Sequence, residues 1–297
     1  MKKLIIKESQ LKVIKKHINE IAQRSYIFDW DDNILYMPTK IKMDKNVGGK
    51  WESVDVSTEE FAHIRSNPEY RLRNNDAVVA FEDFRKSESF LRDAEQAIHH
   101  EKFAPSFEKF KEALIYANPF AINTARGHKP EVLKKGVRMF IDMVLTDDEK
   151  QTMVNNIRKE ITHQIPGYRM FKMGSLNDNQ IIDVYLDEFG EYYPVSSEEF
   201  GERFGLETSG GAANPEHAKK VAIEHFTKKV LANVKKLVDS GTYTKVSIGF
   251  SDDDKKNVVA SEEFLQNELS KMYPNLHFVV YDTSEGGKNK LVIQKES

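Results

Sequence analysis

Two pairs of aspartates stand at the ends of apolar segments that lie far apart in the chain. Asp29 and Asp31 close "SYIFDWD", and Asp252 and Asp253 close "KVSIGFSDD". Side chains two apart in a strand point the same way, so we expect Asp29 and Asp31 to face one pocket. Converging carboxylates repel each other unless a cation or a shared proton compensates, and Mg²⁺ prefers such oxygen ligands. Either pair alone is also typical of a turn or a helix cap, so one metal site requires that both pairs meet.

A third polar element follows the apolar run "FAINT". Thr124 closes this run and is followed by Ala125, Arg126 and Gly127. A hydroxyl and free backbone N–H groups at such a point, beside the start of the next helix, can hold a phosphoryl oxygen. A threonine that ends a strand is equally compatible with a purely structural role.

The fourth element is a lysine in "NPEHAKKVAIEHFTKKVLANVKKL". The apolar stripe of this predicted helix consists of Ala222, Ile223, Phe226, Val230, Val234 and Leu237. Extrapolating the stripe backwards reaches Lys219, whereas Lys220 lies about 100° away around the helix. A lysine there can neutralise carboxylates and phosphate at the sheet edge, or it can extend into solvent. Which of the two lysines faces the site stays open.

Strands and helices must bring these four elements together. We expect strands in "SYIFDWD" and over 119–124, 180–186, 245–251 and 277–282, and helices over 9–23, 105–117, 130–144, 147–163, 215–239 and 261–271. Strand, loop and helix in succession are typical of a parallel sheet with flanking helices. Ligands bind at the carboxyl edge of such a sheet, where all four elements would lie.

A segment of different character follows the first strand. The stretch "ILYMPTKIKMDKNVGGKWESVDV" predicts a β-hairpin that turns at Gly48 and Gly49, and Ser57 with Glu60 predicts a helix capping box. Residues 66–103 are charged and mostly helical in pattern. We therefore predict an α+β lid over 36–104, inserted into a core of 1–35 plus 105–297, with a second insertion around 146–214 left open. The aromatic residues of these insertions can line a substrate pocket or form the lid's own small core.

Composition narrows the classes of function. The 297 residues include 44 basic and 47 acidic side chains, so the net charge of −3 gives no global reason to expect a nucleic-acid or membrane partner. The absence of cysteine excludes disulfides, thiolate metal sites and cysteine nucleophiles. No apolar run approaches the ~20 residues of a membrane helix, and the first ten residues lack a signal-peptide core. We expect a cytoplasmic protein, with its oligomeric state undetermined.

Taken in order, these motifs resemble those of the haloacid dehalogenase-like hydrolase superfamily. "FDWDDNIL" is similar to the first motif of that family, "FAINTARGH" to the second, "AKKVAIEHF" to the third and "IGFSDDDKKN" to the fourth. The resemblance covers roughly 20–35, 105–145 and 215–282. It implies a Rossmann-like parallel core with an inserted cap.

The resemblance also implies roles for single residues. Asp29 would be the nucleophile that forms an aspartyl-phosphate, and Asp31 would protonate the leaving oxygen and then activate water. Thr124 and Lys219 would hold the phosphoryl oxygens, with Ala125 and Arg126 beside the phosphate. The Mg²⁺ ligands would be Asp29, the main-chain carbonyl of Asp31, and Asp252, with Asp253 ligating directly or through water.

Two positions depart from the family pattern: Asn33, where threonine or valine is usual, and Asn257, where aspartate is common. Neither replaces a primary catalytic group. An acid/base aspartate at position 31 favours a phosphatase over an enzyme that acts on carbon–halogen bonds. The substrate would be a phosphorylated small molecule or nucleotide. The alternatives are a phosphatase that acts on nucleic-acid ends, and a binding or structural protein that keeps the fold with little activity.

Overall fold

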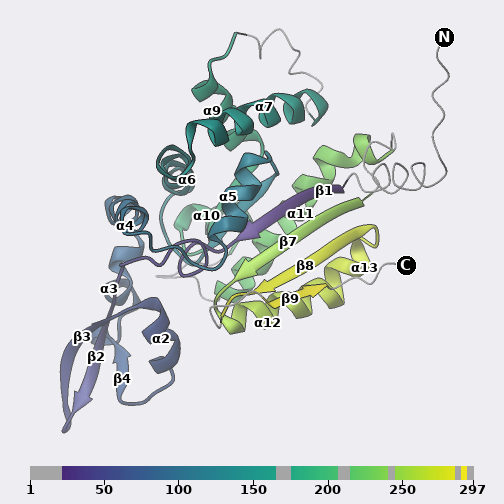
Figure 1. Ribbon diagram of the computed structural model, residues 1–297. Helices are drawn as coiled ribbons and strands as arrows, with labels where there is room; N and C mark the ends of the chain where they lie inside the picture. Colours follow the sequence, from purple (N-terminus) through teal and green to yellow (C-terminus); the bar gives the residue numbers. More distant parts are fainter. Residues whose placement is uncertain (1–21, 165–174, 207–214, 240–244, 285–288, 293–297) are drawn as a thin grey trace, which may run out of the picture.

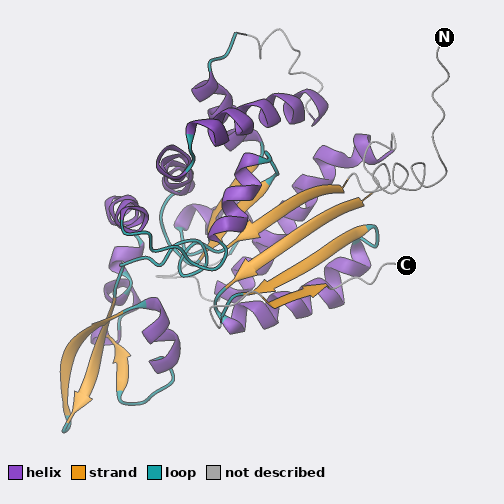
Figure 2. Ribbon diagram, viewed as in Figure 1, coloured by secondary structure: helices purple, strands orange, loops and turns teal. Residues whose placement is uncertain are grey.

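The chain forms an α/β structure with one large and one small sheet. The computed structural model describes residues 22–164, 175–206, 215–239, 245–284 and 289–292 (Figure 1). Helices flank both faces of the large sheet, and the separate small sheet is antiparallel (Figure 2). This confirms the predicted α/β class with a parallel sheet. The helix predicted over 9–23 lies outside the described residues, except that Ala22 and Gln23 begin the first strand.

The large sheet has the strand order β6-β5-β1-β7-β8-β9. Its strands are β1 (Ala22–Phe28), β5 (Phe120–Thr124), β6 (Gly190–Pro194), β7 (Lys245–Asp252), β8 (Leu276–Asp282) and β9 (Asn289–Val292). The first five strands in this order are parallel, and β9 runs antiparallel to β8. Because β1 lies between β5 and β7, the ends of all three strands meet at one edge.

Two layers of helices bury the two faces of this sheet. One face is covered by α4 (Ser87–His99), α5 (Phe107–Ile115), α6 (Pro130–Val144), α7 (Asp147–Gln164) and α9 (Asp178–Glu188), and the other by α10 (Glu198–Phe204), α11 (Pro215–Asp239) and α12 (Lys255–Phe264). Alternation along β1 shows the division, since Tyr26 and Phe28 belong to the first core and Ile27 to the second. Apolar residues thus occupy both sides of the strand, as a central parallel strand requires.

Two sequence predictions were wrong. Residues 180–186, predicted as a strand, lie in α9, which begins with a capping box between Asn177 and Gln180. Its buried residues, Ile181, Ile182, Tyr185 and Leu186, repeat with a helical period that the β-branched run obscures. The helix predicted over 261–271 begins earlier, as α12, because Asp254 accepts a hydrogen bond from the Lys256 N–H and caps it. That helix continues through 265–269 and α13 (Ser270–Met272).

The small sheet consists of β2 (Ile41–Val47), β3 (Lys50–Val56) and β4 (Tyr70–Leu72), with α2 (Thr58–Ile64) between β3 and β4. Gly48 and Gly49 have φ of 58° and 86°, so the hairpin turn lies where the sequence predicts it. The predicted capping box of Ser57 and Glu60 is also present. We call residues 41–75 the small-sheet region.

Short helices connect the small-sheet region to the large core. The segment 73–84 contains η1 (Arg73–Asn75), α3 (Ala77–Ala80) and η2 (Glu82–Phe84) and leads into α4. Helix α4 packs against α6, and its Phe90 is fully buried in the larger core. The predicted insertion 36–104 therefore includes both the small sheet and a helix of the main hydrophobic core. The exact domain boundaries stay a prediction.

The small-sheet region lies on the side of the large sheet toward which its strands point. In Figure 1 the arrowheads of β1, β7 and β8 end on the side where α2 and β2 to β4 are drawn. Loops that follow these strands are therefore placed between the sheet edge and the small-sheet region. Among the described helices, none is both long and apolar enough to cross a membrane.

Candidate metal and phosphate site

Strand register brings the two aspartate pairs together. Phe28 at the end of β1 pairs with Ser251 in β7, and the Asp29 N–H donates to the Ser251 carbonyl over 2.9 Å. Asp29 therefore lies beside Asp252, although 223 positions separate them in the sequence. One carboxylate oxygen from each of Asp29, Asp252 and Asp253 lies within 4.8 Å of the others. The structure thus assembles the cluster that the separate motifs predict.

Lys219 reaches this cluster from α11. Its Nζ lies 2.6 Å from Asp252 Oδ2 and 3.4 Å from Asp29 Oδ1, and the side chain is 2% exposed. Lys220 instead lies over the ring of Phe264, with its Nζ 5.9 Å from the centroid. Lys219, to which the apolar stripe of the helix extrapolates, is therefore the lysine at the cluster, and the choice that the sequence left open is settled. The alternative in which Lys219 extends into solvent is wrong.

Burial and like charge make this cluster electrostatically costly. Burial raises the pKa of Asp29 to about 8, with Lys219 opposing the rise and Asp252 and Asp31 adding to it. Burial and the neighbouring Asp29 likewise raise the pKa of Asp253 well above its usual range. Burial alone would lower the pKa of Lys219, but Asp252 and Asp29 raise it instead. One ammonium group thus faces three carboxyl groups, and the raised pKa values mean that Asp29 and Asp253 favour bound protons when no cation is present.

These residues fit a divalent cation. Neighbouring oxygens around one octahedral Mg²⁺ lie about 3 Å apart and opposite ones about 4.2 Å. The three carboxylate oxygens of the cluster lie within 4.8 Å of one another. Asp29 Oδ1 is buried and accepts no hydrogen bond from the described residues, although it is paired with Lys219. A bound cation would supply a partner for that atom and would replace the protons that the raised pKa values of Asp29 and Asp253 favour. The cation's identity as Mg²⁺ stays a prediction.

Asn33 explains one departure from the family pattern. Its Nδ2 donates to the carbonyls of Asp29, over 3.0 Å, and Ser251. Its Oδ1 accepts from the hydroxyls of Ser251 and Thr283, over 2.8 and 2.9 Å. A fully buried amide therefore ties together the segments that follow β1, β7 and β8. Neither threonine nor valine could make all four hydrogen bonds.

Asn257, the second departure, belongs to the cluster's surroundings. Its Nδ2 donates to Asp252 Oδ1 over 3.2 Å, and the Asp254 N–H donates to the same oxygen over 3.0 Å. With Lys219 on its other oxygen, the Asp252 carboxylate has donors on both sides. These contacts fix its orientation toward Asp29.

Asp31 faces a different partner from Asp29. Arg126 contacts it with a guanidinium fork, Nε to Oδ2 at 2.8 Å and Nη2 to Oδ1 at 2.6 Å. Thr124 Oγ1 is a longer donor to Asp31 Oδ2, at 3.4 Å. The structure thus brings Asp31, Thr124 and Arg126 together, but the arginine side chain is engaged with the acid. Contacts of Thr124 and Arg126 with a substrate phosphoryl group stay predictions.

Two other predicted residues lie at the rim. Ala125 is exposed in the loop that follows β5. Asp32, the third aspartate of the motif, accepts a hydrogen bond from the Thr58 hydroxyl of the small-sheet region. Burial raises the pKa of Asp32 to about 6, and the Thr58 hydrogen bond opposes the rise. Its φ of 53° starts the tight turn that returns the chain after Asp31.

Sequence reasoning missed the contacts between the small-sheet region and this rim. Arg65, at the end of α2, forms two hydrogen bonds with the Asp254 carboxylate, over 3.1 and 3.2 Å. Asp254 directly follows the metal cluster in the chain. A positive residue in the predicted insertion and a third aspartate after β7 were the only signals, and both are common on protein surfaces.

His128 is a buried histidine that the sequence did not single out. It lies two residues after Arg126, is 2% exposed, and its ring centre lies 4.9 Å from that of Phe90. Burial, assisted by the nearby Arg126 charge, lowers the pKa of His128 from 6.5 to about 4. Its ring is therefore neutral at pH 7.

A scan of the chain against protein-family models finds no match, and searches of curated proteins and of solved structures find none either. Geometry and the resemblance of short motifs therefore carry the functional argument.

If the acidic cluster binds Mg²⁺, adding this ion should reverse the order of the melting temperatures of the wild type and the Asp253→Asn variant. We expect Asp253→Asn to melt at or above the wild type in metal-free buffer, because it removes a carboxyl group whose raised pKa shows that its ionised form is disfavoured beside Asp29 and Asp252. In saturating Mg²⁺ the wild type should become the more stable protein, since binding at 100 times Kd contributes about 2.7 kcal/mol. Thermal melts with and without Mg²⁺ measure both, with the exposed Asp148→Asn as the control. Equal Mg²⁺ shifts in the wild type and both variants would contradict the site.

The lowered pKa of His128 predicts that the folded protein loses stability as the pH falls. Between pH 6.5 and 4 the unfolded chain carries a proton on this ring that the folded protein lacks, so stability falls as the pH is lowered through that window. The full difference corresponds to roughly 3 kcal/mol. Denaturant unfolding at pH 7 and pH 4.5 should therefore show a smaller loss in His128→Phe than in the wild type. His99→Phe, at an exposed histidine of α4, should keep the wild-type loss.

Proposed function

We propose that the protein is a Mg²⁺-dependent phosphohydrolase of the haloacid dehalogenase-like type that works through an aspartyl-phosphate on Asp29. The observation that carries this proposal is the cluster that the buried Asp29 and Asp252 form with the half-buried Asp253 and with Lys219. Asp31 lies two residues after Asp29 in the chain. Four short motifs with this resemblance thus converge on one sheet edge. A cytoplasmic location goes with this proposal as a further expectation.

Asp29 fits the role of nucleophile. A carboxylate oxygen of Asp29 attacks phosphorus, the bond from phosphorus to the leaving oxygen breaks, and Asp31 gives that oxygen a proton. In the second step Asp31 takes a proton from water, the water oxygen attacks phosphorus, and the bond to Asp29 breaks. Inorganic phosphate leaves and both aspartates return to their starting states. Covalent catalysis divides one difficult displacement into two easier ones.

Positive charge must offset the charge of the transferring group. A Mg²⁺ ion held by Asp29, the Asp31 carbonyl, Asp252 and Asp253 would supply part of that charge when bound. Lys219 already lies between Asp29 and Asp252 and would hold a phosphoryl oxygen with Thr124 and Ala125. Phosphoryl transfer depends chiefly on such positioning and charge.

The small-sheet region fits the role of a cap over this site. Two of its residues donate hydrogen bonds to the rim of the site: Thr58 to Asp32, and Arg65 to Asp254. Asp32 directly follows the proposed acid/base, and Asp254 directly follows the metal cluster. A cap anchored at these two points would exclude water from the aspartyl-phosphate.

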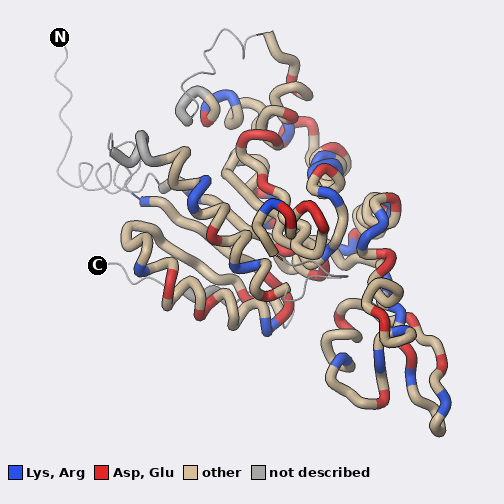
Figure 3. The backbone as a smooth tube through the Cα atoms, turned by 180° about the vertical axis from the view of Figure 1, so that it is seen from behind, with Lys and Arg blue, Asp and Glu red and all other residues tan. Residues whose placement is uncertain are grey.

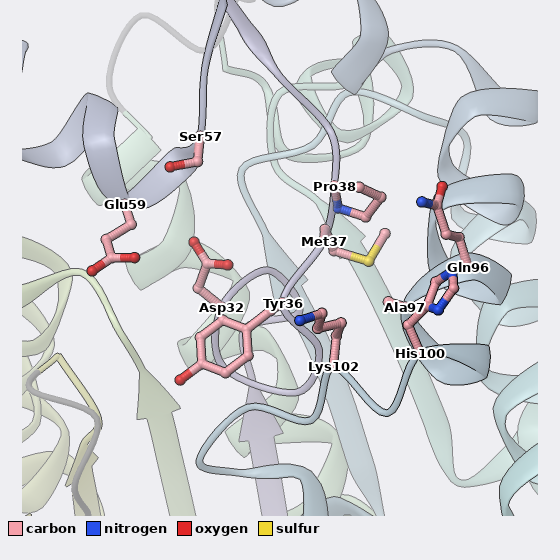
Figure 4. A pocket seen from close by; sticks show the side chains of 10 residues that line it. All are labelled: Asp32, Tyr36, Met37, Pro38, Ser57, Glu59, Gln96, Ala97, His100 and Lys102. Carbon is pink, nitrogen blue, oxygen red and sulfur yellow. The ribbon is translucent and has the colours of Figure 1, made fainter.

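A cavity between the cap and the core supports a small leaving group. It has a volume of about 370 Å³, which suits a small organic molecule. Figure 4 shows the carboxylates of Asp32 and Glu59 on one side, Gln96 and His100 on the other, and Lys102 between them, with the ring of Tyr36 beside Asp32. Burial raises the pKa of Tyr36, and the charges of Asp32, Glu59 and Asp253 add to the rise in that order.

These charges favour a small phosphomonoester over a nucleic-acid end. Asp32 and Glu59 would repel the next phosphate of a polynucleotide, and Lys102 is the one lysine among the residues that line the cavity. Figure 3, which shows the molecule from behind, has basic and acidic residues interspersed along the described chain. No continuous basic track crosses the described residues in that view.

The nucleophile assignment predicts the loss of turnover in one variant. Asp29→Asn should lower the hydrolysis of p-nitrophenyl phosphate by at least about a thousandfold, because an amide cannot form the acyl-phosphate. The measurement is p-nitrophenol release in the presence of Mg²⁺, together with a melt that shows a folded protein. Asp148→Asn should retain wild-type turnover. Unchanged turnover in Asp29→Asn would refute the role of this residue.

The cavity predicts which phosphate esters are preferred. The wild type should hydrolyse glycerol 2-phosphate with a kcat/KM on the order of tenfold above that for a 3′- or 5′-phosphorylated oligonucleotide, because like charges beside the site disfavour a second phosphate. Phosphate release measured for both ester classes at one salt concentration tests this. A higher kcat/KM for the oligonucleotide would instead support nucleic-acid end processing.

A further inference from the structure

The proposed acid/base is the first of four buried polar residues that are linked in series by hydrogen bonds. Arg126 is fully buried and donates a hydrogen bond to each carboxylate oxygen of Asp31. Its Nη2 also donates to Thr39 Oγ1 over 2.8 Å, and Thr39 Oγ1 donates to Asp93 Oδ2 over 2.7 Å. Asp31, Arg126, Thr39 and Asp93 are therefore linked in series.

The four members come from separate parts of the fold. Asp31 follows β1 and Arg126 follows β5, whereas Thr39 precedes β2 in the connection to the small-sheet region. Asp93 lies in α4, where Arg92 pairs with its other carboxylate oxygen over 2.9 Å. The series thus joins two strand ends of the core to the start of the small-sheet region.

Packing prevents the arginine from taking other positions at low cost. Its guanidinium lies over the rings of Phe84 and Phe90, with the central carbon 4.7 and 5.1 Å from the ring centres. A buried guanidinium must keep its charged partners, because an unpaired buried charge is strongly destabilising. The fork on Asp31 and the hydroxyl of Thr39 are the partners it has here. Rotation toward a substrate would require it to leave them.

The two hydrogen bonds from Arg126 leave Asp31 able to transfer protons. Each carboxylate oxygen has two lone-pair sites, and a guanidinium fork uses one on each oxygen. The remaining sites can receive or give a proton, and the Asp31 side chain is 11% exposed. Arg126 holds the carboxyl group from the buried side, so that its free sites face the rim of the site.

We propose that Arg126 is a positioning residue for Asp31, and that Thr39, anchored on Asp93, holds Arg126 in place. This inference rests on the proposed function, because it assigns a partner to the acid/base of that reaction. It also ties the orientation of Asp31 to the segment that leads into the small-sheet region. Proton delivery to the leaving oxygen would then depend on a hydroxyl that touches neither substrate nor Asp31.

Two esters with different leaving groups test this dependence. The alkoxide of glycerol 2-phosphate needs a proton in order to leave, whereas p-nitrophenolate leaves without one. The ratio of the two kcat/KM values, alkyl over aryl, reports proton delivery in the first chemical step, because kcat/KM does not include the later hydrolysis of the aspartyl-phosphate. A loss of metal or of general fold would lower both values together.

Thr39→Val removes the hydroxyl and keeps the shape. We expect the alkyl-to-aryl ratio to fall by on the order of tenfold in Thr39→Val, and to return to near the wild-type value in Thr39→Ser. The matched control is Thr227→Val, a fully buried threonine of α11 whose hydroxyl donates to the Ile223 carbonyl over 2.8 Å. This control should lose stability without changing the ratio.

Arg126→Lys separates positioning from substrate binding. Lysine keeps the charge but lacks the fork, so the ratio should fall further than in Thr39→Val. If Arg126 instead bound the phosphoryl group, both esters would lose kcat/KM by the same factor, and the inference would be overturned. An unchanged ratio in Thr39→Val would also overturn it. A wild type that hydrolyses neither ester would instead remove the proposed function, and this inference with it.

Discussion

The crowding of three carboxyl groups, two of them buried, around one ammonium group is the constraint on which the rest of the site depends. Asp29, Asp252 and Asp253 lie close together beside Lys219, and solvent cannot separate their charges. Such a cluster persists only when the surrounding structure prevents the groups from moving apart. The fold meets this requirement with parallel strands whose ends are fixed in register, and with α11, whose apolar stripe directs Lys219 inward. A cation at the cluster would turn the electrostatic cost into binding energy.

Asn33 shows how the strand ends are kept in place. Without it, repulsion between Asp29 and Asp252 would act on two chain segments joined mainly by backbone hydrogen bonds. Its amide adds four contacts to the segments after β1, β7 and β8, and the Ser251 hydroxyl also contacts Ser106 over 2.6 Å. Because all these groups are buried, loss of any one would leave a partner unsatisfied. The residue that departs from the family pattern is thus part of what holds the cluster together.

The sequence predicted the parts of the site that follow from local periodicity. Apolar runs located β1, β5 and β7, and therefore the acidic ends, while a helical stripe selected Lys219 over Lys220. It failed where two periods overlap, as in the β-branched run of α9, and in β6, whose sequence GEYYP has no aliphatic side chain and contains both glycine and proline. Thr39 and Asp93 gave no signal, because a threonine in a loop and an aspartate in a charged helix are usually exposed. Only the tertiary fold brings them to Arg126.

Asp29 and Asp31 are separated by one residue, yet the fold gives them opposite surroundings. Asp29 shares a single ammonium group with two other carboxyl groups, and its pKa of about 8 favours a bound proton until a cation replaces it. Asp31 is paired with the guanidinium group of Arg126, which packs against two phenylalanine rings and donates a hydrogen bond to Thr39. Two carboxyl groups of equal intrinsic chemistry can take different roles only when their environments differ in this way. The tryptophan between them is fully buried against Phe90 and Phe110 and anchors the short segment that carries both carboxyl groups. A division of labour between nucleophile and acid/base would thus follow from the different groups that surround each carboxyl group.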